Sequence, residues 1–387
     1  MLSKEEKTMK KALAIFMALM LAAALVAGCG TSKDGGGSGD NAPAGDSAQS
    51  PAGGGESSGA PAGGDDMYIS VVSKGFQHQF WQAVKAGSDA AAADLGVTIF
   101  FTGPEGESAV ADQVNMINAE LAKNPAAIAL AVLDTESVRT QLQDAQDRGI
   151  PVIGFDSGVP DALPGQIAAN ASTNNEAAAA LGADHMFEEL KDKIGAATAA
   201  DPVVIVVLSQ DVTSASITGR TAGFAKRMYD LASGANDSVA ITGGYNAINT
   251  GDAGAAVRIE VVVGATPDIT DMTNAANGLL NTANLIGVFC SNEGAVNGLL
   301  AAINAGTAVP SGVLLVGFDA GSGQKAAIKA GIFIGSITQD PFSIGYKAVE
   351  LAVAAAKGQT VSDVDTGAKW YDASNIDDPD IAILVYD

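Results

Sequence analysis

The chain has 387 residues, of which 47% are hydrophobic and 5% aromatic, and its formal net charge is −23. A field of this sign repels phosphate backbones, so the composition argues against nucleic acid as a partner. The length is enough for two domains with additional segments. The two cysteines, Cys29 and Cys290, are too few for a disulfide framework, and Cys290 lies in an apolar run, where a thiol packs as a small hydrophobe.

Residues 1–28 have the pattern of a bacterial lipoprotein signal peptide. Four lysines among residues 4–11 precede an apolar run over 12–27, which at about 16 residues is short for a membrane-spanning helix. The run ends in Leu-Val-Ala-Gly-Cys29, which resembles the cleavage box of lipoproteins. The resemblance implies that Cys29 becomes the N-terminus and carries the lipid (palmitate) that anchors the protein on the extracytoplasmic face of the cell membrane. An uncleaved anchor, the alternative, would end at the same membrane.

Residues 29–66 predict a disordered tether of Gly, Ser, Ala and Pro. No large apolar residue occurs in 30–66, so the segment cannot bury enough surface to offset its ordering entropy. As a flexible coil it would span roughly 30–36 Å between the membrane and a globular body.

From residue 67 onward, strand-like and helix-like patterns alternate. Fully apolar or period-two runs predict strands, and runs of period 3.6 predict helices. In the first half, strands are expected at 67–72, 97–101, 127–133, 151–155 and 166–169, and helices at 80–95, 109–121, 137–148 and 176–190.

The pattern restarts after residue 200. Residues 246–269 read as an insertion that carries an extra strand at 257–263. Strands that alternate with crossover helices predict an α/β fold of two doubly wound parallel-sheet lobes with a ligand cleft between them. In the second half, strands are expected at 202–208, 239–243, 285–290, 314–318 and 332–337, and helices at 217–232, 272–280, 297–305, 324–330 and 344–356.

One short sequence motif occurs twice after residue 66. It reads Pro151-Val-Ile-Gly-Phe-Asp-Ser-Gly158 in the first half and Leu314-Leu-Val-Gly-Phe-Asp-Ala-Gly321 in the second. Each copy places an aspartate, Asp156 or Asp319, just past the carboxyl end of a buried strand, where open parallel sheets bind ligands. We therefore expect one carboxylate from each lobe in a shared cleft. A chance repeat of Gly-Phe-Asp at two ordinary turns is the alternative.

Other polar side chains also follow predicted strands. Ser73 and Lys74 come after the first strand, Arg220 lies beyond the first strand of the second half, and Asn292 and Gln339 stand at the ends of later strands. Because parallel strands end at one edge of their sheet, these side chains are expected to face the cleft.

Aromatic residues gather in the first of these loops. Phe76, Phe80 and Trp81 lie close together in a chain that is poor in aromatics. Carboxylates, amides and a guanidinium orient sugar hydroxyls, which both donate and accept, and aromatic rings pack on the apolar faces of a sugar. The pattern therefore favours a sugar site. Core packing of Phe80 and Trp81 is the alternative, and the pair can serve both roles.

Residues 67–387 resemble the sugar-binding proteins of bacterial ABC importers, of the ribose and galactose class in the periplasmic-binding-protein-like type I family. The matching stretches follow one another in the family's order over nearly the whole body. They are Val71-Val-Ser73 with Phe80-Trp81, Pro151-Val-Ile-Gly-Phe-Asp156, Gly219-Arg-Thr-Ala-Gly-Phe224, Val288-Phe-Cys-Ser-Asn-Glu293, Val316-Gly-Phe-Asp319 and Ile337-Thr-Gln-Asp-Pro341.

The resemblance implies a hinge of crossover strands between the lobes. The N-terminal lobe is expected to comprise 67–170 plus 339–368, and the C-terminal lobe 171–338 plus 369–387. Closure of the hinge over the ligand would exclude water, and the closed form would dock on a permease.

The resemblance also implies a substrate-binding role for individual residues. Phe80 and Trp81 match the aromatic pair that sandwiches the sugar ring, and Arg220 matches the arginine near the ring oxygen. The remaining expected contacts are two aspartates that accept from hydroxyls, two amides and three polar residues of the first loop: Asp156, Asp319, Asn292, Gln339, Ser73, Lys74 and Gln79.

Several positions depart from the ribose binders. Gln77-His-Gln79 replaces a tighter turn, Ser157 stands in place of an arginine, and Ala131 in place of an asparagine. These changes weaken the case for ribose itself. Lys74, together with the loop Gly103-Pro-Glu105, is similar to the related receptors for autoinducer-2.

The leading hypothesis is thus a monomeric, lipid-anchored receptor that delivers a monosaccharide, or a closely related polyol, to the permease subunits of an ABC transporter. A sensory receptor for a sugar or an autoinducer-2-like ligand is the alternative. An enzyme is not expected, because the chain has no Gly-x-Gly-x-x-Gly after its first strand and no Walker loop. No cofactor or metal is expected: the two histidines, His78 and His185, lack ligand spacing, and the acidic residues of 372–380 read as a solvated turn.

Overall fold

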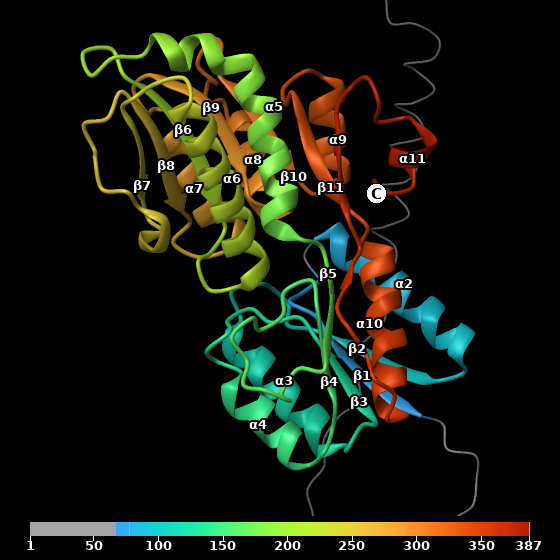
Figure 1. Ribbon diagram of the computed structural model, residues 1–387. Coiled ribbons are helices and arrows are strands. Elements are labelled where there is room, and N and C mark those ends of the chain that lie inside the picture. Colours follow the sequence, from blue (N-terminus) through green and yellow to red (C-terminus); the bar gives the residue numbers. More distant parts are fainter. Residues whose placement is uncertain (1–66, 77, 387) are drawn as a thin grey trace, which may run out of the picture. The chain divides into compact units, whose positions relative to one another are not determined.

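A computed structural model describes residues 67–76 and 78–386 (Figure 1). The expected signal peptide, Cys29 and the tether up to residue 66 lie outside these described residues. Within the described ranges, no helix combines the length and the apolar character needed to cross a membrane.

The first sheet has six parallel strands in the order β12-β5-β4-β3-β1-β2. Successive residues of β1 face opposite sides, so that Val71 packs under one helix pair and Val72 under another. The strands are β1 (Tyr68–Val72), β2 (Thr98–Thr102), β3 (Ala127–Leu130), β4 (Val152–Phe155), β5 (Ala169–Ser172) and β12 (Val364–Asp365), and the helices are α2 (Gln79–Leu95), α3 (Val110–Ala122), α4 (Arg139–Asp147) and α10 (Pro341–Ala356).

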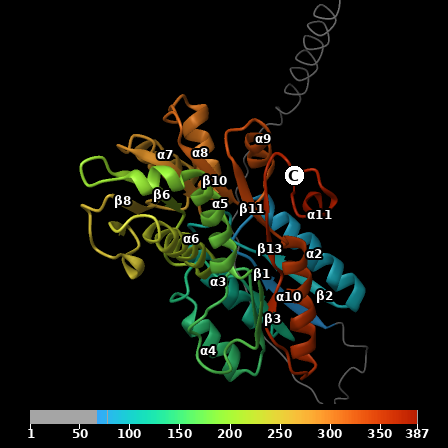
Figure 2. The same ribbon diagram turned by 45° about the horizontal axis from the view of Figure 1, so that its top comes forward.

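Helices α2 and α10 lie side by side on one face of this sheet (Figures 1 and 2). Glycines permit their close approach: a Cβ on Gly87 would lie 1.9 Å from the carbonyl oxygen of Phe342, and a Cβ on Gly345 would lie 1.9 Å from that of Val84. Because α10 comes from the far end of the chain, this contact ties the C-terminal part of the sequence to the first lobe.

The second sheet has seven strands in the order β13-β11-β10-β9-β6-β8-β7, all parallel except β13, which runs antiparallel to β11. Helices α5 and α6 cover one face, and α7, α8 and α9 cover the other. The strands are β6 (Val203–Ser209), β7 (Val239–Gly243), β8 (Val257–Val263), β9 (Leu285–Cys290), β10 (Leu314–Phe318), β11 (Gly335–Gln339) and β13 (Ala368–Tyr371), and the helices are α5 (Asn175–Ala196), α6 (Ala215–Ser233), α7 (Ile269–Leu279), α8 (Glu293–Asn304), α9 (Ser322–Lys329) and, near the C-terminus, α11 (Pro379–Ala382).

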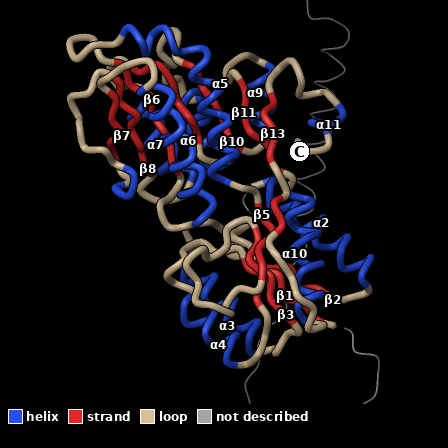
Figure 3. The backbone as a smooth tube through the Cα atoms, in the orientation of Figure 1, coloured by secondary structure: helices blue, strands red, loops and turns tan. Residues whose placement is uncertain are grey.

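Two α/β lobes with helices on both faces of each sheet confirm the predicted fold class. The chain passes between the sheets after β5, after β11 and after β12, and these connections lie together in Figure 3. The expected lobe boundaries at 170/171, 338/339 and 368/369 stay a prediction.

The main error of the predicted elements concerns residues 246–269. The strand at 257–263 exists as β8, but it is not an extra strand carried by an insertion: it lies within the sheet, between β6 and β7. It pairs along its whole length with β6 and along five residues with β7, which takes the edge. The strand expected at 166–169 is found at 169–172 as β5, where it pairs with β4.

Candidate ligand-binding site

Asp156 and Asp319 occupy equivalent positions in the two lobes. Each follows a strand directly and has a left-handed backbone, with φ of 52° and 75°. Each donates its backbone N–H to the carbonyl of the next strand, Asp156 to Ala171 at 3.0 Å and Asp319 to Ile337 at 2.7 Å. Aspartate tolerates this conformation better than most residues, and here it turns both buried carboxylates into one cavity.

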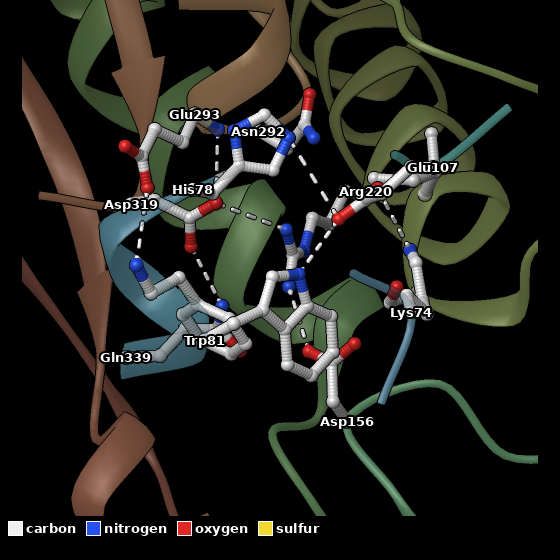
Figure 4. A pocket seen from close by; sticks show the side chains of 13 residues that line it. Lys74, His78, Trp81, Glu107, Asp156, Arg220, Asn292, Glu293, Asp319 and Gln339 are labelled. Carbon is white, nitrogen blue, oxygen red and sulfur yellow. Dashed lines mark hydrogen bonds and ion pairs between the residues drawn. The ribbon is translucent and has the colours of Figure 1, made fainter. Parts of the chain in front are cut away.

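Arg220 of α6 lies between these two carboxylates (Figure 4). Its Nη2 is 3.7 Å from Oδ1 of Asp156, and its Nη1 is 3.5 Å from Oδ2 of Asp319. The guanidinium stacks 4.0 Å above the ring of Phe318, and its Nε donates to Oδ1 of Asn175 at 2.7 Å. The side chain is thus held on three sides and carries one charge across the space between the lobes.

The Asp319 carboxylate is further fixed by the second lobe. Gln339 donates its Nε2 to Oδ1 at 2.7 Å, and the backbone N–H of Glu293 donates to Oδ2 at 3.0 Å. Asn292 begins α8 as its cap, with Oδ1 accepting from the N–H of Ala295 at 3.0 Å. The Oε1 of Gln339 is buried and has no hydrogen-bond partner among the described residues, so it is available to a ligand donor.

Phe80 and Trp81 combine the two roles that the sequence left open. Both line the cavity, and both belong to the hydrophobic core under α2. Their rings meet edge to face with centroids 5.0 Å apart, and Trp81 also meets Phe155 at 6.3 Å. The core therefore orients the rings that the cavity presents.

Glu107, which the sequence analysis did not single out, is the buried centre of a charged cluster. Its Oε1 accepts from Nε1 of Trp81 at 2.8 Å, and its Oε2 lies 3.6 Å from Nζ of Lys74. Burial raises the pKa of the Glu107 carboxyl, but the charges of Lys74 and His78 outweigh it and lower that pKa to about 2. For Lys74 burial acts to lower the pKa, and the surrounding carboxylates, Glu107 first, raise it. Glu107 and Lys74 are therefore both charged at neutral pH.

Two other carboxyls have raised pKa values. Burial raises the pKa of Asp156 to about 6, despite the opposing charges of Lys74 and Arg220. Burial also raises the pKa of Glu293. The cavity therefore contains one carboxyl with a lowered pKa, that of Glu107, beside two with raised pKa values, those of Asp156 and Glu293.

The structure brings eight of the ten predicted binding residues to one cavity. Ser73 and Gln79 do not line it. The Ser73 hydroxyl donates to the carbonyl of Thr102, and Gln79 accepts from the N–H of Ser322 in the other lobe at 2.8 Å. Their contact with a ligand stays a prediction. Five further residues line the cavity: His78, Glu107, Ser216, Ile217 and Glu293.

The lobes are closed over this cavity. Across its margin, Ser108 donates to Asp268 at 2.8 Å and Thr213 donates to the carbonyl of Leu133 at 3.1 Å. Among the described residues, no group of three or more acidic, histidine or cysteine side chains is placed to hold a metal ion. The acidic turn at the C-terminus instead makes local bonds, such as that from Nε1 of Trp370 to Asp372.

A polar cavity with aromatic walls, closed between two α/β lobes, defines a two-lobed solute-binding protein. Residues 69–360 match the model of a family described as periplasmic binding protein domain, and the chain belongs to this family. It is a family of extracytoplasmic binding proteins rather than of enzymes.

Similar proteins carry related descriptions. The D-allose-binding periplasmic protein of Escherichia coli (strain K12) is 25% identical over 309 residues, which cover 78% of this chain and 88% of that protein. A structure from Brachyspira murdochii, described as an ABC transporter, LacI family transcriptional regulator, is 43% identical with a TM-score of 0.70, covering 83% of this chain and 99% of that one. An ABC transporter solute-binding protein from Agrobacterium vitis with bound D-fucose is 28% identical with a TM-score of 0.68, covering 82% and 100%.

Proposed function

We propose that this chain is an extracytoplasmic receptor that captures a monosaccharide, or a closely related polyol, by closing its lobes and delivers it to an ABC transporter permease. The observation that carries the proposal is the pair Asp156 and Asp319, which face one cavity from equivalent strand ends with Arg220 between them. The relatives described as binding D-allose and D-fucose point to the same ligand class.

The cavity has the chemistry that a neutral, hydroxyl-rich ring requires. Oxygens of Asp156, Asp319 and Gln339 would accept from ligand hydroxyls, and Arg220 and Lys74 would donate. The faces of Phe80 and Trp81 would pack on the apolar side of the ring. Asn292 would act mainly by holding the start of α8, because its amide is already bonded within the protein.

The proposed mechanism needs an open state and a closed state. In the open state the lobes part at the three connections and expose the cavity to water. The ligand then bridges groups of both lobes and shifts the equilibrium toward the closed state. We further propose that Cys29 anchors the protein by its lipid, that residues up to 66 form the tether, and that the receptor acts as a monomer with the lobe boundaries given above.

A thermal-shift screen tests the ligand class. The purified protein would be heated with D-allose, D-fucose, other hexoses and pentoses, polyols and autoinducer-2, each at about 1 mM. A ligand present at 100 times its dissociation constant adds about 2.7 kcal/mol of stability, so a cognate sugar should raise the melting temperature by several degrees. No shift with any sugar or polyol would contradict the proposal. A sugar that binds but whose uptake is unchanged when the gene is deleted would favour the sensory alternative.

A further inference from the structure

A second link between the lobes lies beside the ligand cavity, at Glu107 and Gln210. Glu107 precedes α3 in the first lobe, and Gln210 follows β6 in the second. Gln210 donates its Nε2 to Oε2 of Glu107 at 2.7 Å. The Glu107 side chain is only 3% exposed and Gln210 is fully buried, so this bond between the lobes is shielded from water.

The two carboxylate oxygens of Glu107 accept hydrogen bonds from different donors. Oε2 accepts from Gln210, whereas Oε1 accepts from Nε1 of Trp81 at 2.8 Å. One carboxylate therefore joins the indole that lines the ligand cavity to the opposite lobe. Figure 4 shows Trp81, Glu107 and Lys74 around this corner of the cavity. A hydrogen bond to an ionised acceptor is stronger than a neutral one, and more so where water is excluded.

Gln210 is itself positioned by the second lobe. Its Oε1 accepts from Nδ2 of Asn292 at 2.7 Å, and its backbone N–H donates to the hydroxyl of Ser291 at 3.1 Å. Its side chain lies over Gly294, where a Cβ would come within 1.9 Å of Oε1. The amide is therefore held with its N–H₂ group toward Glu107.

We infer that Glu107 and Gln210 form a latch that holds the closed state and orients Trp81, so that Glu107 is a positioning residue that sets how long a ligand stays bound. The inference rests on the proposed function. When the lobes part, Glu107 and Gln210 separate and water solvates both. The bond between them therefore contributes to the closed state alone, and its loss should speed opening while leaving the encounter of ligand with the open lobes unchanged.

Stopped-flow kinetics with the best sugar of the thermal-shift screen tests the latch. Gln210→Ala should raise the dissociation rate at least about tenfold, with the association rate changed by less than about threefold. Ser108→Ala is the matched control, because it removes another hydrogen bond between the lobes, from the same loop as Glu107 but at the exposed rim. A dissociation rate for Gln210→Ala no higher than that of Ser108→Ala would overturn the inference.

A rescue experiment separates the latch from a general loss of packing. Glu107→Gln alone leaves one amide oxygen for two donors, Nε1 of Trp81 and Nε2 of Gln210, and should also raise the dissociation rate. The double variant E107Q/Q210E reverses donor and acceptor and keeps the net charge, so slow dissociation should return at least in part. A double variant that dissociates as fast as the faster single variant would contradict a hydrogen-bonded latch.

Tryptophan fluorescence tests whether the latch orients Trp81, which a purely structural role of Gln210 would not do. The chain has two tryptophans, and Trp370→Phe leaves Trp81 as the reporter. In this background, Gln210→Ala should reduce the change in Trp81 emission on sugar binding, whereas Ser108→Ala should not. An equal emission change in both variants would overturn the link to Trp81. Failure of the unmodified protein to bind any sugar would instead contradict the proposed function.

Discussion

Asp156 and Asp319 hold a single guanidinium between them, that of Arg220, at 3.7 and 3.5 Å. One aspartate follows β4 of the first sheet and the other follows β10 of the second, and both have a left-handed backbone. The two carboxylates would repel each other without a cation between them. This relationship links the repeated Gly-Phe-Asp motif to the closed arrangement of the lobes.

Arg220→Lys should weaken sugar binding by at least about tenfold. A lysine ammonium is one compact charge and cannot present two separated N–H groups to two carboxylates or stack on Phe318 as a planar group does. Isothermal titration calorimetry measures the change. Arg227→Lys on the same helix is the matched control, because Arg227 pairs with Asp184 at the surface, where such a pair contributes little. Equal affinities for the two variants would count against the role of Arg220.

The pH dependence of stability should reflect Asp156. Burial between the closed lobes raises the pKa of Asp156 to about 6, so the folded protein with its lobes closed keeps a proton there that the unfolded chain has already released. The contribution of Asp156 to the free energy of unfolding is therefore present below the ordinary aspartate pKa and is lost as the pH rises through about 6. Thermal denaturation between about pH 4 and pH 7 should show this decline, and Asp156→Asn should reduce it. A decline of the same size in the variant would contradict the assignment.

Sugar affinity should change with pH in the opposite direction. Relative to the closed state without ligand, a ligand hydroxyl that donates to Asp156 favours the ionised carboxylate, so binding to this state should release a proton and strengthen as the pH rises through about 6. The charged neighbours that face this carboxyl are Lys74, Arg220, Asp319 and Glu107. Calorimetry in two buffers of different ionisation enthalpy would count the protons. Binding without proton release near pH 6 would show that the ligand does not contact Asp156 in this way.

Gly345→Ala should destabilise the protein by about 1–3 kcal/mol, because a Cβ there would lie 1.9 Å from the carbonyl oxygen of Val84 and force α10 away from α2. Gly278→Ala is the matched control. It also lies in a helix, but a Cβ placed there would have no atom within 4 Å beyond its own helix backbone and chain neighbours, so alanine should be neutral or stabilise by up to about 1 kcal/mol. Denaturant titration of both variants decides whether the contact is as tight as described.

The fold was predictable because its periodicity is strong. Alternating apolar strands and period-3.6 helices located most elements within a few residues. The strands β12 and β13 were missed, and both form by pairing with strands far away in the sequence, β5 and β11. The run at 257–263 was read correctly as a strand, but only pairing with β6 and β7 places it inside the sheet.

The position of a residue at the cavity was predictable where the residue ends a buried strand or directly follows one. Asp156, Asp319 and Gln339 were found in this way. Glu107 and Gln210 were missed for a different reason: each lies in a loop with several polar residues, and no pattern shows which side chain turns inward. A signal was present for Gln210, which comes immediately after β6, but its role depends on a partner 103 positions away in the sequence.

The most direct test of a sugar site between the lobes is the affinity of Asp319→Ala for the best sugar of the screen, measured by isothermal titration calorimetry. Asp377→Ala, at an exposed carboxylate paired with Lys329, serves as the control. We expect Asp319→Ala to remain folded and to lose measurable binding, because Arg220, Gln339 and the N-terminus of α8 lose their common acceptor. An affinity equal to that of the unmodified protein would contradict the site.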